Sequence, residues 1–551
     1  MTFRKFLASA MLVSAAGPAL AIPPGFKEKA DKIIEAASPA GGPGYTVVIT
    51  EDGKTAYRHE RGLANVEAKS SITPTTSFRY ASITKQFTAA AIMKLVDQGK
   101  VSLDDPLTKY LPDYPGPGGA ATVRQLLNHT SGIMPYTQIP AWAEKANAGA
   151  IATTQSLIDV FKDVPLQFQP GEKYSYNNSG YVLLGAILEK VTGKSWDEAI
   201  VSTVTGPLGL KSIMSGVHEP HVKGMATGYT DEDGKIVPSP SIHMSNPHAA
   251  GALIGTADDL ARWGHALHSG KVVSPASYAL MTTAQKTNDG QDIAYGFGLA
   301  PGDVRGRKSV GHNGNIHGFS SGSVYVAEPR IFVAVLSNSD SLNESATLAT
   351  RLAAAAIGDP FPEFTAQPVD MKAVAPLLGS YALPVGDRLF FERGGKLYTR
   401  RSGGRELEAF PAGGNRFFYG SDGLTWFAIT TDAAGKRVME MHHDGASEPE
   451  RSTWAGPVPA EKVAVIVPAD LLESYVGTYT SPIGEFLITR KDDRLEVKLG
   501  GQPSIGMKAV SNTEFEIAEV GAKLTFSNVV DGKAGAMTLD QRGQTIEAKR
   551  K

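Results

Sequence analysis

Apolar residues recur at every third or fourth position in several stretches of the first 360 residues, and this spacing predicts amphipathic helices. The stretch from Ser82 to Gln98 shows the pattern most clearly, and Gly99 directly after it favours a left-handed C-terminal cap. Thr256 is expected to cap a later helix, with Asp259 three positions on. The predicted helices cover residues 26–37, 82–98, 182–191, 258–267 and 344–357.

Two pairs of short apolar segments predict β-hairpins near the two ends of the same region. Residues 45–50 and 55–60 flank a turn that contains Gly53, and residues 323–327 and 331–337 flank Pro329. The order of hairpin, several helices, hairpin and helix predicts an α/β domain, in which an antiparallel sheet is flanked by helices and joined by an all-helical region.

The sequence pattern changes after Gly358. Prolines there mark a linker, and predicted strands separated by glycine turns follow. This part contains an internal repeat: the residues around Gly379 and Tyr381 recur around Gly477 and Tyr479 at a constant offset. We therefore predict two copies of a small all-β, barrel-like domain. The predicted boundaries are 22–360 for the α/β domain, 361–372 for a linker, 373–456 for the first β domain, 457–468 for a second linker and 469–551 for the second β domain.

The N-terminal segment has the composition of a secretory signal peptide. Arg4 and Lys5 precede an apolar, alanine-rich run that ends in the small residues around Ala21. We predict that residues 1–21 are cleaved and that the protein is periplasmic or secreted; the alternative is an uncleaved membrane anchor. Gly17-Pro18 interrupts the run, which is short for a membrane span.

The composition of the chain argues against several partners and kinds of catalysis. The 551 residues carry a formal net charge of −2, which gives no reason to expect nucleic acid as a partner. The chain has no cysteine, so thiol catalysis and disulfides are excluded. His218 and His221, and likewise His442 and His443, lack a third ligand at metal-site spacing. We predict no metal and no cofactor.

A serine and a lysine three positions apart, Ser82 and Lys85, open the best predicted helix. Residues at this spacing share one helix face, so the lysine can reach the serine hydroxyl, which needs a base to become a nucleophile. The partial positive charge of the helix N-terminus disfavours a protonated lysine there. The pair alone is weak evidence, because a capping serine beside a solvated lysine is common.

Two later segments supply further polar groups. Tyr176 and Asn178 stand just before an apolar helix; a tyrosine acts as a base only if its pKa falls well below ~10, and Lys85 could supply the required field. His312, Gly314 and Asn315 precede a strand, and a glycine there lets substrate backbone approach closely. Seen singly, these segments could also be an ordinary aromatic helix entry and a glycine-rich turn.

Together and in this order, the three elements resemble the serine β-lactamase and penicillin-binding superfamily. They resemble most closely its class C β-lactamase-like branch, which includes D-Ala-D-Ala carboxypeptidases, D-aminopeptidases and esterases. The resemblance covers roughly residues 26–358. It implies the following roles: Ser82 as nucleophile, Lys85 as its proton partner, Tyr176 as general base and proton shuttle, Asn178 as a substrate-binding amide, His312 as a source of electrostatic stabilisation or proton transfer, Gly314 as part of the substrate-binding strand, and the N–H groups of Ser82 and Asn315 as the oxyanion hole.

One residue departs from the pattern of that branch. Asn313 stands where members that recognise a substrate carboxylate have threonine. We therefore predict a serine hydrolase that acts on a small molecule or short peptide through an acyl-enzyme, most specifically a D-aminopeptidase-like peptidase, since two β-barrels after such a domain resemble the D-aminopeptidase architecture. Carboxylesterase, β-lactamase and D-Ala-D-Ala carboxypeptidase activities remain alternatives, as does a penicillin-recognising binding protein without turnover. The oligomeric state stays open.

A second serine motif is set aside. Residues 318–322 match the Gly-x-Ser-x-Gly pattern of a nucleophile elbow, which needs a strand before it and a helix after it. Here we expect a glycine-rich loop before it and a strand after it.

Overall fold

The computed structural model describes residues 22–38, 41–240, 242–341, 345–402, 404–420, 423–460, 465–500, 504–517, 520–530, 532–541 and 544–551. The predicted signal segment, residues 1–21, lies outside these ranges. The chain divides into two compact units, Met1–Phe361 and Pro362–Lys551. The finer domain and linker boundaries stay predictions. In the described part of the chain, no helix combines the length and apolar character that crossing a membrane requires.

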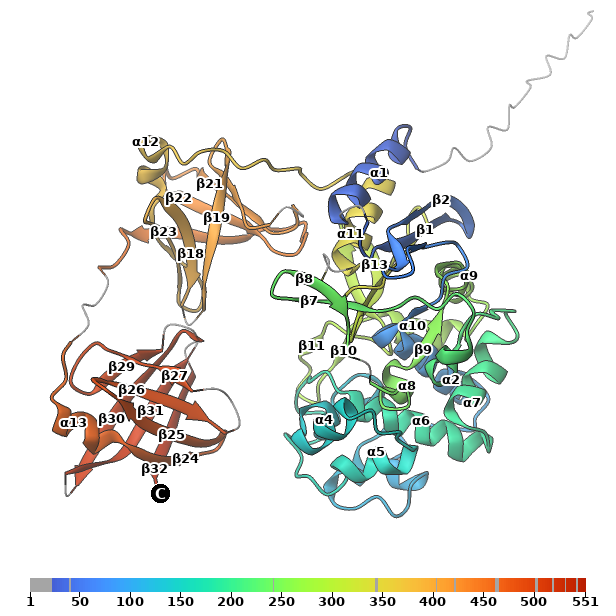
Figure 1. The fold of residues 1–551 in the computed structure, drawn as a ribbon, viewed down its shortest axis with the longest axis horizontal. Coiled ribbons are helices and arrows are strands. Elements are labelled where there is room, and N and C mark those ends of the chain that lie inside the picture. The colour runs from blue at the N-terminus through green and yellow to red at the C-terminus, as the bar shows by residue number, and fades with distance from the viewer. Residues whose placement is uncertain are drawn as a thin grey trace, which may run out of the picture. The chain divides into compact units, whose positions relative to one another are not determined.

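An antiparallel six-stranded sheet forms the centre of the first unit (Figure 1). Its central strands read as continuous apolar runs, because both faces of the sheet are covered by helices. All seven residues of Ile331–Ser337 are buried. In spatial order the strands are β12 (Ala300–Val304), β13 (Arg307–Ile316), β14 (Phe319–Val326), β15 (Ile331–Ser337), β1 (Tyr45–Glu51) and β2 (Lys54–Arg61).

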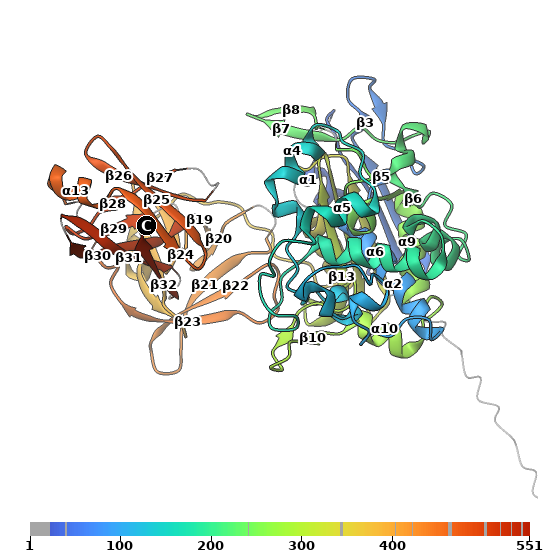
Figure 2. The same cartoon turned by 90° about the horizontal axis from the view of Figure 1, so that it is seen from below.

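Two pairs of helices cover opposite faces of this sheet (Figure 2). Adjacent strand residues point to opposite faces. Gly322 of β14 lies against Ser345 at the start of α11 (Ser345–Ala356), which packs on α1 (Phe26–Ala37). The next residue, Ser323, instead accepts a hydrogen bond from Gln86 of α2 (Thr84–Asp97), at 2.9 Å. Helix α9 (Ala257–His268) shares this second face and stacks Trp263 on Phe87 of α2.

The predicted all-helical region packs around α6 (Asn178–Thr192), which contacts α2, α3, α5, α7 and α8. The other helices and turns of the unit are η1 (Ala81–Ile83), η2 (Leu107–Lys109), η3 (Pro117–Ala120), α3 (Val123–Leu127), η4 (Tyr136–Gln138), α4 (Pro140–Asn147), α5 (Thr154–Phe161), α7 (Trp196–Ile200), η5 (Val201–Thr205), η6 (Gly216–His221), α8 (His248–Gly251) and α10 (Pro275–Thr282). Short strands complete it: β3 (Leu63–Asn65), β4 (Ser70–Ser71), β5 (Phe78–Arg79), β6 (Met214–Ser215), β7 (Tyr229–Glu232), β8 (Lys235–Pro238), β9 (Leu253–Gly255), β10 (Gln285–Lys286) and β11 (Asp292–Ile293).

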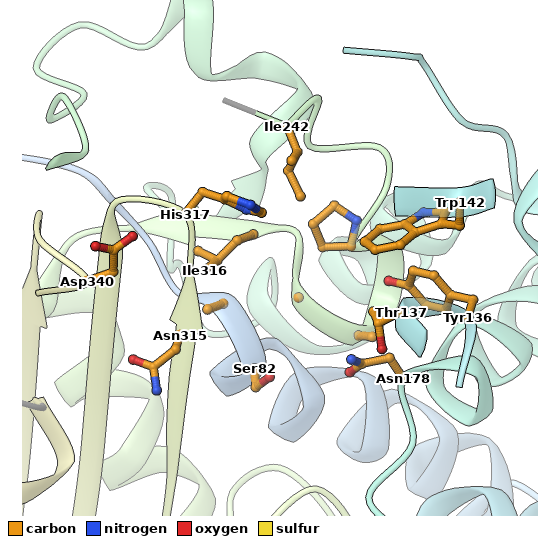
Figure 3. Close-up of a pocket in the computed structure, with 14 residues that line it drawn as sticks. Ser82, Tyr136, Thr137, Trp142, Asn178, Ile242, Asn315, Ile316, His317 and Asp340 are labelled. Atoms are coloured by element: carbon orange, nitrogen blue, oxygen red, sulfur yellow. The ribbon is translucent and has the colours of Figure 1, made fainter. Parts of the chain in front are cut away.

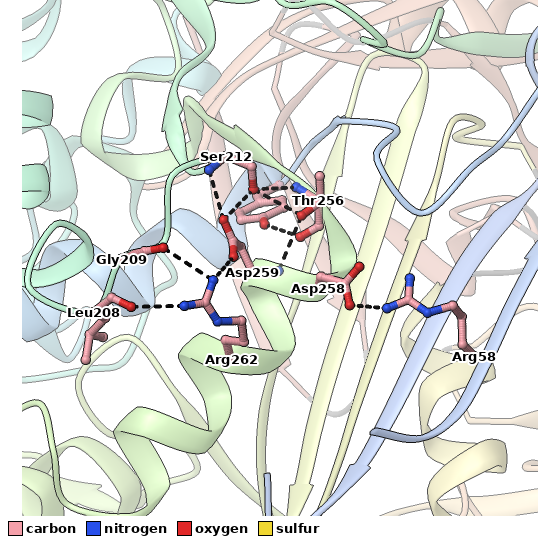
Figure 4. Close-up of polar contacts among 9 residues, drawn as sticks. Arg58, Leu208, Gly209, Ser212, Thr256, Asp258, Asp259 and Arg262 are labelled. Carbon is pink, nitrogen blue, oxygen red and sulfur yellow. Dashed lines mark hydrogen bonds and ion pairs between the residues drawn. The ribbon is translucent and has the colours of Figure 1, made fainter. Parts of the chain in front are cut away.

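The start of α9 is fixed by a polar network (Figure 4). Thr256 caps the helix as predicted, because its hydroxyl accepts the N–H of Asp259 at 3.3 Å. The Asp259 carboxylate also accepts the N–H and hydroxyl of Ser212 and the guanidinium of Arg262. The Thr256 carbonyl accepts the hydroxyl of Tyr80 at 2.6 Å, so this network holds the residue that leads into η1.

The helices predicted over 26–37 and 258–267, and the hairpin predicted over 45–50 and 55–60, are confirmed within a residue at each end. Four predictions need correction. The first strand of the second hairpin, predicted from Ser323, begins at Phe319. The helix predicted from Ser82 begins at Thr84, after the short turn η1, and the helix predicted from Val182 begins at Asn178. Residues 312–316, expected in a glycine-rich loop, belong to strand β13. Histidine, asparagine and glycine have low strand propensity, but pairing with β14 along the whole segment overrides it.

The second unit is all β, as predicted. Its first part is a closed eight-stranded barrel and its second a nine-stranded, nearly closed one. The repeat is structural: Tyr381 and Tyr479 are both fully buried, and each donates its hydroxyl to the carbonyl four residues earlier.

The elements of this unit are α12 (Met371–Val374), η7 (Ala375–Leu377), β16 (Gly379–Ala382), β17 (Asp387–Arg393), β18 (Lys396–Arg401), β19 (Glu406–Gly413), β20 (Arg416–Phe418), β21 (Trp426–Thr431), β22 (Arg437–His442), β23 (Glu450–Gly456), α13 (Ala469–Tyr475), β24 (Gly477–Ser481), β25 (Gly484–Lys491), β26 (Arg494–Leu499), β27 (Ile505–Gly506), β28 (Lys508–Ala509), β29 (Glu514–Ile517), β30 (Ala522–Val530), β31 (Lys533–Gln541) and β32 (Gln544–Arg550).

Candidate active site

Ser82 lies at the middle of η1, in a turn that is held from several sides. Ala81 has a positive φ of 49°, a strained conformation for a residue with a side chain. The carbonyl of Tyr80 accepts the hydroxyl of Ser321 from β14 at 2.7 Å, while its own hydroxyl is bound at α9. The turn is thereby anchored to both the sheet and the helix layer, and Ser82 is presented between them.

Lys85 is fully buried, and its amine lies among three oxygens. Nζ is 3.2 Å from Ser82 Oγ, 2.8 Å from Asn178 Oδ1 and 2.8 Å from the Ala250 carbonyl. In the described part of the chain it has no carboxylate partner: these oxygens are all uncharged. Burial without a countercharge disfavours the ammonium form, and it holds the pKa of Lys85 well below its usual value.

Tyr176 lies beside this amine, with Lys85 Nζ 4.7 Å from the centre of its ring. Burial of its hydroxyl end raises the pKa of Tyr176, although 37% of the whole residue is exposed, and a hydrogen bond with Ser82 acts in the opposite direction. The possibility that Lys85 lowers the pKa of this phenol is therefore not realised. The reason is that removal of the hydroxyl end from water disfavours the phenolate more than the hydrogen bond with Ser82 favours it.

Asn178 is the first residue of α6, and Asn177 before it caps the helix by accepting the N–H of Gly180 at 3.1 Å. The Asn178 Oδ1 accepts from Lys85, so its amide nitrogen remains as a donor group at the site. Asn178 thus couples the lysine to the helical region.

Strand β13 supplies the third predicted segment. A Cβ on Gly314 would lie 2.6 Å from the Tyr80 carbonyl oxygen and 2.8 Å from the Ser82 nitrogen. Glycine is therefore required for the strand to approach η1, and it brings Asn315 beside Ser82. The predicted oxyanion hole needs this proximity; Gly314 itself acts as a spacer within the protein.

His312 is buried and bound at both ring nitrogens. Its Nδ1 donates to the Asn313 carbonyl at 2.6 Å, so Nε2 accepts the hydroxyl of Tyr295 at 2.9 Å. Burial lowers the pKa of His312 to about 3. The ring is thus neutral near pH 7, which favours a role in proton relay or orientation over one as a fixed positive charge.

An aromatic cluster around Tyr176 was not assigned a role from the sequence. The centre of the His129 ring lies 4.4 Å from that of Tyr176 and 4.7 Å from that of Tyr295, with the rings tilted, and Nδ1 of His129 accepts the N–H of Asn177. Its Nε2 is buried without a hydrogen-bond partner among the described residues. His129 and Tyr295 stand in segments that share the family resemblance, but only the fold shows that they pack on the catalytic tyrosine candidate.

A cavity of about 390 Å³ opens beside Ser82 (Figure 3). Figure 3 shows Tyr136 and Trp142 on one side and His317 on the other, with Ile242 between them. Asp340 lies beyond His317. Asn178 and Asn315 border it near Ser82. Among the described lining residues Asp340 is the single carboxylate, and there is no lysine or arginine.

The remaining predicted features are placed as follows. Residues 318–322 lie in the β13–β14 turn and β14, so no helix follows Ser320, and the nucleophile-elbow reading fails. In the described part of the chain, no group of three or more histidine, aspartate or glutamate side chains could hold a metal ion.

Comparison with known proteins matches residues 30–357 to the beta-lactamase family and residues 461–550 to a domain of unknown function (DUF3471). Penicillin-binding protein 4* of Bacillus subtilis (strain 168) is 28% identical over 430 residues, covering 73% of this chain and 93% of that protein. A D-aminopeptidase of Gluconobacter oxydans (strain 621H) is 30% identical over 331 residues, covering 59% of this chain and 61% of that protein.

Solved structures give the same relationship. The octameric penicillin-binding protein homologue from Pyrococcus abyssi matches with a TM-score of 0.56 and 26% identity, over 86% of this chain and 98% of that one. The D-amino acid amidase from Ochrobactrum anthropi SV3, complexed with D-phenylalanine, matches with a TM-score of 0.53 and 25% identity, over 60% of this chain and 98% of that one.

Proposed function

This chain belongs to the beta-lactamase family and is a serine hydrolase, and on that basis we propose that it hydrolyses amide bonds on the carbonyl side of D-amino acid residues through an acyl-enzyme on Ser82. The observation that carries the substrate class is the lining of the cavity beside Ser82, which has no lysine or arginine. A substrate carboxylate, as in a β-lactam or D-Ala-D-Ala peptide, would find no cation there.

Two further facts support this choice. Asn313 replaces the threonine whose hydroxyl helps to bind a substrate carboxylate in other members, as the family resemblance implies. The relatives include a D-aminopeptidase, and the similar solved structures include a D-amino acid amidase.

Lys85 is the base that activates Ser82. A neutral amine has two N–H groups and one lone pair; the two N–H groups are used by Asn178 Oδ1 and the Ala250 carbonyl, each at 2.8 Å. The lone pair is then left for the Ser82 hydroxyl at 3.2 Å. As the oxygen attacks the substrate carbonyl, its proton passes to Lys85, and the N–H groups of Ser82 and Asn315 stabilise the developing oxyanion.

Tyr176 delivers the proton to the leaving amine. Because its pKa is raised, it is a phenol near pH 7 and can donate its proton while it recovers one from Lys85. His129 and Tyr295 pack against its ring, His129 tilted and Tyr295 edge-on. Water then attacks the acyl-enzyme, with the proton transfers reversed, and releases the acid and free Ser82.

A substrate panel on one preparation tests the proposal: D- and L-phenylalanine p-nitroanilides, p-nitrophenyl acetate and nitrocefin, each with Ser82→Ala as the control. We expect the D-anilide to be hydrolysed at least tenfold faster than the L-anilide, with a barrier difference of ~1.4 kcal/mol or more. Equal rates on the two anilides contradict the D-residue assignment. A single equivalent of opened nitrocefin with a stable Ser82 adduct would instead indicate a penicillin-recognising protein.

A further inference from the structure

The carbonyl that accepts the Lys85 amine belongs to a short helix. Ala250, whose carbonyl oxygen lies 2.8 Å from Lys85 Nζ, is the third residue of the four-residue helix α8. The preceding carbonyl, that of Ala249, accepts the hydroxyl of Thr88 at 2.7 Å, so α8 lies along α2. A small rotation of α8 would move both carbonyls, and the orientation of this helix therefore decides where Lys85 finds its acceptor.

The first residue of α8, His248, has a strained backbone. Its φ is 49°, in the left-handed region. This conformation is disfavoured for a residue with a side chain, although histidine adopts it more often than most residues. It persists only where neighbouring groups hold it. His248 is only 3% exposed, so these groups must be sought around its buried ring.

A directed hydrogen bond links the ring to α5. His248 Nε2 lies 3.0 Å from Thr154 Oγ1, and Thr154 gives its own hydroxyl proton to the Glu189 carboxylate at 2.9 Å. The proton between ring and hydroxyl therefore comes from Nε2. Burial lowers the pKa of His248 to about 3, so the ring is neutral near pH 7 and Nδ1 carries no proton. Among the described residues, Nδ1 has no hydrogen-bond partner.

Close packing fixes the ring on its other sides. The Trp196 ring of α7 is tilted against it, with 5.0 Å between the ring centres. In α6, a Cβ on Gly185 would lie 2.7 Å from His248 Cε1, so glycine is required for this helix to approach the ring. The His248 side chain thus links the start of α8 to α5, α6 and α7.

We infer that His248 is a positioning residue for the acylation of Ser82, because its ring holds the strained start of α8. The Ala250 carbonyl is thereby directed at one N–H of Lys85. The lysine lone pair is then left for the Ser82 hydroxyl. This inference rests on the proposed function, in which Lys85 is the base. His248 is not among the described residues that line the cavity, so it should affect the rate of acylation and not the binding of substrate.

Two variants test this role at different strengths. His248→Asn removes the ring but keeps a residue that tolerates the left-handed backbone. Thr154→Val is milder, because it removes the hydroxyl that accepts from the ring and keeps the shape of the side chain. The assay is the pre-steady-state release of p-nitrophenol from p-nitrophenyl acetate at several substrate concentrations. It yields the acylation rate constant, the substrate dissociation constant and the burst amplitude. The amplitude counts the folded active sites, so a role in stability alone lowers the amplitude and leaves the rate constant unchanged.

We expect His248→Asn to lower the acylation rate constant at least tenfold, since a small misplacement of a catalytic group is costly. Thr154→Val should lower it about threefold. The dissociation constant should stay within about twofold in both variants. The double variant should lose no more than His248→Asn alone, because Thr154 acts through the ring. A rate constant within about twofold of wild type in His248→Asn overturns the inference, as does a Thr154→Val loss that adds in full to the other.

Matched controls use a second histidine and a second threonine. His268 at the end of α9 also has a pKa lowered by burial to about 3, and its ring is bound to the Tyr278 hydroxyl at 2.8 Å. Thr192 in α6 donates its hydroxyl to the Leu188 carbonyl at 2.7 Å. His268→Asn and Thr192→Val should leave the acylation rate constant within about twofold of wild type. Losses in these controls equal to those in His248→Asn and Thr154→Val overturn the inference.

Failure of the proposed function appears in other measurements. Equal rates on D- and L-phenylalanine p-nitroanilides contradict the substrate assignment, and undiminished acylation of Lys85→Met contradicts the assignment of the base. An unchanged rate constant in His248→Asn, with both of those tests passed, refutes the positioning role alone.

Discussion

The close approach of β13 to the Ser82 turn makes Gly314→Ala a sensitive test of the site. The added Cβ would lie 2.6 Å from the Tyr80 carbonyl oxygen and 2.8 Å from the Ser82 nitrogen, both backbone atoms that cannot rotate away. Ordinary contacts are near 3.5 Å, so strand and turn must separate by roughly 0.7–0.9 Å. Because the proposed oxyanion site lies between them, we expect a loss of about 10²-fold in the acylation rate.

The free energy of unfolding should fall by about 1–3 kcal/mol, as at other overpacked positions. The assay is the pre-steady-state release of p-nitrophenol from p-nitrophenyl acetate, alongside thermal unfolding. Gly302→Ala is the mild control, since its nearest atom would be the flexible Ser309 hydroxyl at 3.3 Å. Gly311→Ala is the control for strain in the same strand, because its Cβ would clash with the Ser323 carbonyl. An acylation rate within threefold of wild type in Gly314→Ala would refute the reasoning.

Three other predictions concern protons and domains. Tyr176→Phe should slow anilide hydrolysis about 10²–10⁴-fold but p-nitrophenyl ester hydrolysis much less, because p-nitrophenolate leaves without a proton; equal losses on both substrates argue against the proton-donor role. Burial lowers the pKa of Lys85 in the folded state. At pH values between that pKa and ~10.4, the unfolded chain therefore binds one proton more than the folded chain. Raising the pH from 7 to 9.5 should therefore stabilise wild type relative to Lys85→Met by up to ~1.4 kcal/mol per pH unit, measured by urea unfolding; a constant difference means that Lys85 is an ammonium in the folded protein. Removing the β domains from Ala366 onward should change the ratio of anilide to ester hydrolysis if they shape the site, and an unchanged ratio contradicts that role.

The contacts that form within short segments of the site could be predicted from the sequence. The spacing of Ser82 and Lys85 places both on one turn of chain, and the structure has them 3.2 Å apart even though Ser82 precedes the regular helix. Asn178 was identified as a candidate amide, and it contacts Lys85 directly. These contacts follow from residue order within short segments, which sequence patterns describe well.

The pKa values of the site residues could not be predicted in the same way. The pKa of Tyr176 is raised by burial of its hydroxyl end. The pKa of Lys85 is lowered by burial against α6 and α8, which are far away from it in the chain. Similarly, Asp340 reaches the cavity only because β15 ends beside the β13–β14 turn. Such effects arise from the packing of distant segments and need the fold.

The overall architecture was easier to predict than the strand at the site. Apolar runs such as 331–337 identify buried strands directly, whereas residues 312–316 have the composition of a loop. At Gly314, Ser321 of β14 and the turn that carries Ser82 leave no room for a side chain. Steric need and not strand propensity determines that residue.

The central claim is that Ser82 carries the acyl group, and mass spectrometry of the quenched reaction tests it most directly. After brief mixing with p-nitrophenyl acetate and quenching at low pH, we expect one added acetyl group on the peptide that contains Ser82. We expect none in Ser82→Ala. An acetyl group on another residue, or undiminished turnover by Ser82→Ala, would contradict the account.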